Sequence, residues 1–117
     1  MKLNQSNQEP LSEAVFFILL SIHQAPKHGY AILKEVEFLS EGRVQLSTGT
    51  LYGAIKRLLE KNWIVQVLNQ DEQKRTNRPR KQYALTFAGK QVLEMEISRM
   101  KALLTAAESV QDQGTVS

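Results

Sequence analysis

The fold is decided by residues 47–59, Ser47-Thr48-Gly49-Thr50-Leu51-Tyr52-Gly53-Ala54-Ile55-Lys56-Arg57-Leu58-Leu59, in a chain of 117 residues. The stretch opens with Ser47 or Thr48, whose hydroxyl can accept a hydrogen bond from a free amide of a first helical turn. Apolar residues then recur at helical spacing, at Leu51, Ile55 and Leu58, and predict that one face of the helix is buried. Asn62 lies on the same face one turn further on.

The opposite face of this predicted helix carries Gly49, Tyr52, Gly53 and Lys56. Each glycine costs a helix interior about 1 kcal/mol relative to alanine, so a helix that only meets water has no need of two. Small residues let a second molecule approach closely, and the face also offers a phenol and a cation. We interpret it as a face that lies against DNA; the alternative is a surface helix that tolerates its glycines.

Composition limits the classes of protein to consider. The length suits one domain, and the formal net charge of +3 permits a polyanionic partner without requiring one. The absence of cysteine excludes disulfides and thiolate chemistry and suits a reducing compartment. The apolar run Ala14 to Leu20 is far shorter than the roughly 20 residues that span a bilayer. We therefore expect a soluble cytoplasmic protein with no membrane partner.

Two helices are predicted before the decisive stretch. The first covers Leu11 to Gln24, with Pro10 at its first position, where the missing amide does no harm. A short turn at residues 27–30 leads into a second helix over about residues 30–40. Gly42 is suited to the left-handed residue that follows a helix. The second helix and residues 47–59, joined by a brief turn, form a helix-turn-helix pattern.

A two-stranded hairpin with a long tip is predicted next. Residues 63–68 are rich in branched side chains and read as one strand, residues 82–85 read as another, and residues 69–79 between them are polar. Cations without an intervening acid gather on the second half of this loop and its return strand, at Lys74, Arg75, Arg78, Arg80 and Lys81. They repel one another unless phosphates stand nearby. This favours a DNA-contacting wing, and a merely solvated loop is the alternative.

A long C-terminal helix is expected from Phe87 to Val110, with Thr86 as its N-cap. Its apolar residues follow the spacing of a two-helix coiled-coil seam, at Leu93, Ile97, Met100, Leu104 and Ala107. The helix can fold back on the first helix or pair with a second copy. We favour the second copy, since two-fold dimers are the commonest oligomers.

The predicted fold class is therefore mainly α with a small β-hairpin. A winged helix-turn-helix domain covers residues 10–86, and a dimerisation helix covers residues 87–110. Residues 1–9 and 111–117 are expected to be flexible.

With these elements in place, the chain resembles the PadR family of bacterial transcriptional regulators, named for the repressor of phenolic acid decarboxylase. The resemblance covers roughly residues 12–90. It rests on three motifs in the right order: His28-Gly29-Tyr30; Leu46-Ser47-Thr48-Gly49-Thr50-Leu51-Tyr52 with Ile55, Arg57-Leu58 and Ile64; and Arg80-Lys81-Gln82-Tyr83-Ala84-Leu85-Thr86 with Gly89. Asn62 stands where many members have glycine, and asparagine also tolerates the left-handed conformation.

The resemblance implies a homodimeric repressor that binds a palindromic operator in double-stranded DNA. It implies dimerisation through the C-terminal helix and the partner's first helix, here at Val15, Phe16 and Leu19. A small-molecule effector at the dimer interface would fit the smaller subfamily, which includes regulators of multidrug transporters. Some drug-binding members have an aromatic residue in the C-terminal helix that stacks on planar ligands, whereas no tryptophan lies in this helix.

The predicted DNA-binding residues fall into two groups. The N-terminal end of the 47–59 helix would enter the major groove, where its free amides favour phosphate. On this helix we expect contacts from Ser47, Thr48, Gly49, Thr50 and Tyr52, with Lys56 reaching a base edge, guanine by preference. The wing residues Lys74, Arg75, Arg78 and Arg80 would hold the flanking backbone or enter the minor groove.

Other classes of function have less support. We expect no enzyme, because the chain has no cysteine, no phosphate-cradling glycine loop and only two aspartates, Asp71 and Asp112. His23 and His28 are five residues apart without a carboxylate pattern, so no metal or other cofactor is predicted. The competing hypothesis is a winged-helix module that binds protein or RNA and does not read DNA.

Overall fold

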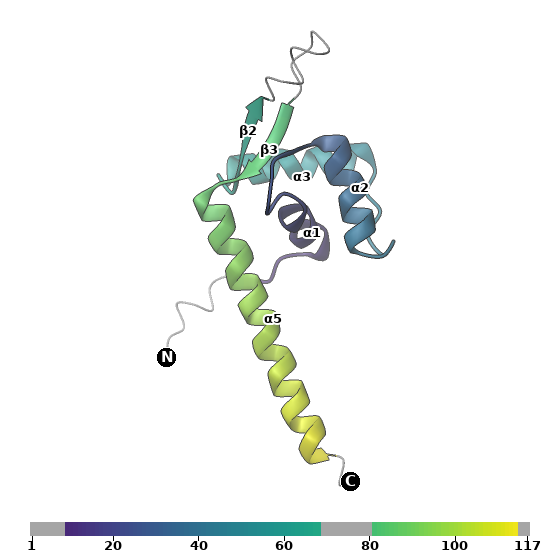
Figure 1. Cartoon of the computed structure of the whole chain (residues 1–117), viewed down its shortest axis with the longest axis vertical. Coiled ribbons are helices and arrows are strands. Elements are labelled where there is room, and N and C mark those ends of the chain that lie inside the picture. The colour runs from purple at the N-terminus through teal and green to yellow at the C-terminus, as the bar shows by residue number, and fades with distance from the viewer. Residues whose placement is uncertain (1–8, 69–80, 115–117) are drawn as a thin grey trace.

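The computed structural model describes residues 9–68 and 81–114. The shorter helices pack together beside a small antiparallel sheet, and one long helix leaves the body of the molecule (Figure 1). This confirms the fold class predicted from the sequence. The elements in chain order are α1 Glu13–Ser21, β1 Lys27–His28, α2 Gly29–Leu39, α3 Thr48–Glu60, β2 Ile64–Leu68, β3 Lys81–Leu85 and α5 Phe87–Gly114.

One hydrophobic core joins the elements. Every helix and both longer strands contribute buried side chains to it, so α3 is fixed from several directions. The apolar face predicted for residues 47–59 is confirmed, because Leu51, Ile55 and Leu58 are all buried and Ala54 joins them. The other buried members are Ile18, Leu19, Ile22, Ile32, Val36, Ile64, Tyr83 and Leu93.

Helix α1 is shorter than the sequence indicates. It begins at Glu13 and ends at Ser21, so the prediction that Pro10 is its first residue was wrong. The reason is Ser12, whose hydroxyl accepts from the amide of Val15 at 3.1 Å and caps a helix that begins three residues after Pro10.

The sheet contains a strand that the sequence analysis missed. The hairpin of β2 and β3 was predicted, but β1 pairs with the free edge of β3 to give the order β1-β3-β2. Lys27 lies opposite Tyr83, and Tyr83 lies opposite Gln66 on the other side. A two-residue strand has no alternating pattern to detect. It matters because it ties the base of the wing to the segment immediately before α2.

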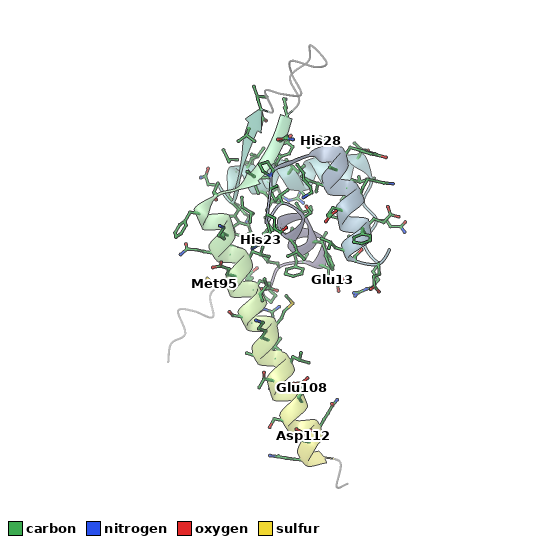
Figure 2. All side chains as sticks on the ribbon, viewed as in Figure 1. Glu13, His23, His28, Met95, Glu108 and Asp112 are labelled. Carbon is green, nitrogen blue, oxygen red and sulfur yellow. The ribbon has the colours of Figure 1, made fainter. Side chains whose placement is uncertain are left out.

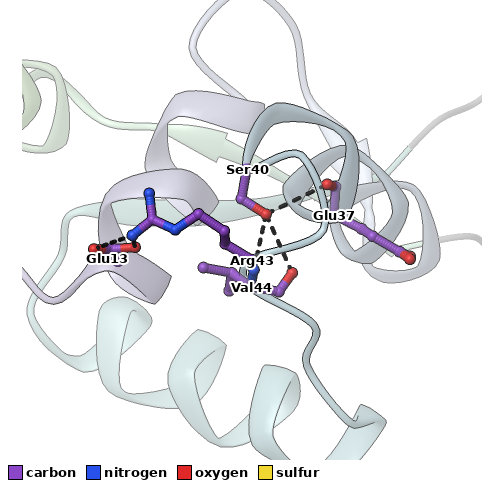
Figure 3. Close-up of polar contacts among 5 residues, drawn as sticks. All are labelled: Glu13, Glu37, Ser40, Arg43 and Val44. Carbon is purple, nitrogen blue, oxygen red and sulfur yellow. Dashed lines mark hydrogen bonds and ion pairs between the residues drawn. The ribbon is translucent and has the colours of Figure 1, made fainter.

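The turn between α2 and α3 is built by Ser40. Its hydroxyl accepts from the amide of Val44 at 2.9 Å and lies within hydrogen-bonding distance of the Glu37 carbonyl (Figure 3). Gly42 adopts the predicted left-handed conformation, with φ of 82°. Arg43 then forms an ion pair with Glu13 at the start of α1, at 2.6 Å. The turn thereby fixes where α3 begins.

Helix α5 is anchored at the corner between α3 and β2. Thr86 caps it, accepting from the Gly89 amide at 3.0 Å and donating to the Asn62 carbonyl at 2.7 Å. A Cβ at Gly89 would overlap the carbonyl group of Trp63, so only glycine fits. Asn62 has the predicted left-handed conformation, with φ of 62°. The orientation of α5 is thus tied to the C-terminal end of α3.

The C-terminal half of α5 extends away from the rest of the molecule (Figure 1). The helix has 28 residues, about 42 Å at ~1.5 Å per residue. The predicted end at Val110 was too early, because residues 111–114, expected in a flexible tail, are helical. Figure 2 places Glu108 and Asp112 on this projecting half.

Candidate nucleic-acid interface

The N-terminal turn of α3 is capped from within. The Ser47 hydroxyl accepts from the Thr50 amide at 3.1 Å and donates to the Thr50 hydroxyl at 2.9 Å. Because the Ser47 hydroxyl already donates its proton to Thr50, Ser47 stabilises the first turn of α3 and has no free hydrogen-bond donor for DNA. The hydroxyls of Thr48 and Thr50 remain able to donate outward, and both side chains are exposed. The positive end of the helix dipole also points outward here, which favours an anion.

Gly49 and Gly53 are not required by packing within the protein. A Cβ at Gly49 would meet nothing within 4 Å, and one at Gly53 would make only an ordinary contact with Nη1 of Arg57 at 3.7 Å. Both glycines have ordinary helical backbones, since neither is among the positive-φ residues. Their cost to helix stability is therefore not offset by any contact among the described residues. The contrast is Gly89, where the protein itself occupies the space.

The cations of α3 point to solvent. Lys56 and Arg57 are exposed, and neither forms an ion pair with any described residue. At the start of β3, Lys81 is exposed as well. The predicted wing contacts Lys74, Arg75, Arg78 and Arg80 lie outside the described residues.

Tyr52 is placed differently from its neighbours on the predicted DNA face. The ring is 44% exposed, but its hydroxyl lies against Gly29, where a Cβ would overlap Oη and lie 2.6 Å from Cζ. Burial raises the pKa of Tyr83 above its ordinary value of 10.0, and the charge that Tyr52 would carry raises it further. The Tyr52 hydroxyl therefore lies over the first residue of α2.

The residues predicted for dimerisation divide into three sets by their exposure in the single chain. Leu19 and Leu93 are 0% exposed in the single chain, so they belong to its own core and have no free surface for a partner. Leu104 is 58% exposed, and Ala107 is exposed beside it. The remaining predicted residues, Val15, Phe16, Ile97 and Met100, are half-buried.

The sequence analysis did not identify a buried carboxylate on α5. Glu96 is 3% exposed and is paired with Arg99, Oε2 to Nη2 at 2.6 Å. The hydrogen bond from Arg99 is the main cause that lowers the pKa of Glu96 below its ordinary value of 4.5; the Leu11 amide acts in the same direction, and burial opposes both. Glu96 is therefore held as a carboxylate by Arg99 on the same helix. Its i,i+3 spacing to Arg99 was a detectable signal.

The described residues do not form a metal cluster or a membrane-spanning helix. No group of three or more metal-ligating side chains occurs among residues 9–68 and 81–114. His28, predicted to be a turn residue, is the N-cap of α2, and its Nδ1 accepts from the Ala31 amide at 3.4 Å. None of the described helices is both long enough and apolar enough to cross a membrane.

The arrangement defines the chain as a winged-helix protein: α2 and α3 form the helix-turn-helix, and β2 and β3 the wing. Comparison with known proteins supports this fold class and identifies the family within it. Residues 18–95 match the model of the transcriptional regulator PadR-like family. The chain therefore belongs to the PadR-like family of transcriptional regulators, as the three sequence motifs indicated.

Two solved structures are similar to this chain in fold. A PadR family transcription regulator of Clostridium difficile R20291 is similar in structure, with a TM-score of 0.70, 24% identity, and coverage of 86% of this chain and 99% of its own. Bacillus subtilis PadR, solved in complex with operator DNA, has a TM-score of 0.64 and 21% identity; the match covers 76% of this chain and 48% of that one.

A relative in sequence is considerably longer than this chain. An uncharacterised 37.1 kDa protein in transposon TN4556 of Streptomyces fradiae is 37% identical over 92 residues. The match covers 79% of this chain but only 24% of that protein. The chain thus spans about a quarter of the length of this relative.

Proposed function

We propose that the protein is a sequence-specific DNA-binding repressor that acts as a homodimer on a palindromic operator. In this proposal the N-terminal half of α3 enters the major groove. Thr48 and Thr50 donate to phosphate oxygens, and Lys56 reaches a base edge. The wing residues Lys74, Arg75, Arg78 and Arg80 hold the flanking backbone. The Bacillus subtilis PadR structure with operator DNA supports this use of the fold.

The observation that carries the proposal is the bare face of α3. Gly49 and Gly53 cost helix stability, yet no described residue fills the space where their side chains would be. The simplest physical reason is an external molecule that must approach the helix backbone closely. Exposed cations flank that face, at Lys56 and Arg57, so the molecule we infer is a polyanion. The depth of a major groove accepts an α-helix.

The dimer is proposed from the projecting half of α5. Three of its large apolar side chains are exposed: Leu104 lies on the predicted coiled-coil seam, and Leu103 and Val110 lie beside that seam. Pairing through this surface would cover them. It would also set the distance between two copies of α3, because α5 is fixed to the end of α3 at Thr86 and Gly89. Half-sites about one helical turn, roughly 34 Å, apart are expected.

The regulatory input is proposed to act on the same interface. A small molecule can relieve repression only if it prefers one spacing of the two α3 helices over another. The half-buried residues of α1 and α5 are placed to sense such a ligand, and Phe16 and Met100 are the pair we would change first. If changing both affected neither dimerisation nor the response to an effector, this placement would be wrong.

The proposal is tested by titrating a duplex from the region upstream of the protein's own gene. Regulators of this kind often control their own transcription. A scrambled duplex of equal length is the control, and both are measured at several salt concentrations. Tight binding of one dimer to the first duplex alone, weakening as salt rises, is the expected result. Equal, weak and steeply salt-dependent binding to both duplexes would mean that the basic wing attracts any DNA, and it would contradict sequence-specific binding to this duplex.

A further inference from the structure

We infer that Tyr52 is a positioning residue, whose phenol, seated on Gly29, holds α3 at a fixed inclination to α2 and to the sheet that carries the wing. Tyr52 lies on the face of α3 that the sequence assigns to DNA. Its hydroxyl is nevertheless directed at α2. The consequence for DNA binding rests on the proposed function, whereas the positioning itself does not.

The contact between Gly29 and Tyr52 is so close that no side chain fits at position 29 while the phenol keeps its place. Gly29 is the first residue of α2 and is buried. A Cβ added there would overlap Oη of Tyr52, lie 2.6 Å from Cζ and lie 3.2 Å from Cε1. Two of these atoms belong to a rigid ring, so a side chain at position 29 would have to expel the phenol. The absence of a side chain at Gly29 is therefore a requirement of Tyr52, because the φ of Gly29 is not in the left-handed region.

The phenol meets the chain where the sheet and the helix-turn-helix are joined. Lys27 and His28 form β1, which pairs with Tyr83 and Gln82 of β3. His28 is at the same time the N-cap of α2. The successive residues Lys27, His28 and Gly29 thus provide the pairing with β3, the N-cap of α2 and the contact with Tyr52. A shift of the phenol would therefore displace both β3 and the start of α2.

This placement changes what Tyr52 can contribute to DNA binding. A hydroxyl directed at Gly29 does not extend toward a phosphate, so the side chain acts through the orientation of α3 and the wing. Thr48 and Lys56, on the same helix, would then contact DNA only when that orientation is kept. The expected signature is a loss of discrimination between duplexes, because the cations that attract any duplex remain in place.

The first test needs no DNA. Backbone amide NMR spectra are compared for wild type, Tyr52→Phe and Tyr52→Ala. Positioning predicts that Tyr52→Phe, which keeps the ring on Gly29, changes little. Tyr52→Ala should shift amides along α3, at the start of α2 and in β3. Changes limited to the residues next to position 52 would overturn the inference.

The Gly29→Ala variant tests the contact from the other side. It should reproduce the pattern of shifts seen for Tyr52→Ala, although the substitution is on another helix. In the double variant the new methyl enters the space that the phenol has left, so its free energy of unfolding should be no lower than that of Tyr52→Ala alone, and higher by any gain in helix propensity from alanine. If Gly29→Ala alone fails to fold, folding of the double variant gives the same answer. Strictly additive effects of the two substitutions would contradict the contact.

The second test measures binding to the cognate and scrambled duplexes. Tyr52→Ala should weaken cognate binding about tenfold or more while leaving binding to the scrambled duplex unchanged, and Tyr52→Phe should stay within about twofold of wild type. A loss for Tyr52→Phe equal to that for Tyr52→Ala would assign the hydroxyl directly to DNA and overturn the inference. If wild type itself does not distinguish the duplexes, the proposed function fails, and the spectra still decide whether Tyr52 positions α3.

Discussion

Substituting Gly53 with alanine should make the protein more stable and a poorer DNA binder. Gly53 lies in the interior of α3, where glycine is about 1 kcal/mol less favourable than alanine. The added methyl would contact only Nη1 of Arg57, at 3.7 Å, so nothing in the protein opposes the gain. For a chain of this size we expect a melting temperature raised by about 3–6 °C.

The loss of affinity follows from the same methyl group. If the backbone at Gly53 lies against DNA, a methyl inserted into that contact should cost about 1–3 kcal/mol, as overpacking of a close-fitted contact does. This corresponds to an increase of about 5- to 150-fold in Kd for the cognate duplex. Binding to a scrambled duplex should hardly change, because no charge is altered.

The assay is thermal unfolding together with fluorescence anisotropy titration of both duplexes. Thr105→Ala is the matched control: it also raises helix propensity at an exposed position, but on the projecting half of α5. It should raise the melting temperature slightly and leave every Kd unchanged. A Gly53→Ala protein that is more stable and binds the cognate duplex as wild type does would refute the reasoning, because the glycine would then be a tolerated defect.

Three further variants probe separate parts of the account. Lys56→Ala should raise Kd for the cognate duplex about 10- to 100-fold, the worth of a base contact, while Lys90→Ala on α5 should not, by anisotropy. Leu104→Glu should shift sedimentation from dimer to monomer, because burying an unpaired carboxylate costs several kcal/mol, whereas Thr105→Glu should leave the dimer intact. Glu96→Gln should lower the melting temperature at pH 7, and its difference from wild type should shrink as the pH falls below 4.5. The lowered pKa of Glu96 gives stability that is present above the ordinary value of 4.5 and lost as the pH falls through the folded-state value.

The sequence was informative where a local pattern had one physical meaning. Spacing alone identified the buried side of α3, and Thr86 and Gly42 marked the start of one helix and the end of another. Such signals are informative because they depend only on contacts within about one helical turn of the same chain segment. The prediction that Pro10 begins the first helix failed because a second local signal, the N-cap residue Ser12, lies only two residues further along the chain.

The rest depended on contacts between distant residues. Nothing near Gly29 in the sequence indicates that Tyr52 fills the space beside it, and the two-residue β1 exists only because β3 has a free edge. Leu93 follows the coiled-coil spacing perfectly, yet the chain's own core covers it. Periodicity reports that a side chain is buried and cannot say which molecule buries it.

The most direct measurement of the central claim is an NMR titration with the cognate duplex that follows the backbone amides. The account predicts that the largest changes fall on the first two turns of α3, from Thr48 to Lys56, and on Lys81 at the start of β3. The amide of Thr105 should be unaffected. Changes centred on another surface, with the amides of Gly49 and Gly53 unmoved at saturation, would contradict it, because the bare face of α3 would then have no DNA against it.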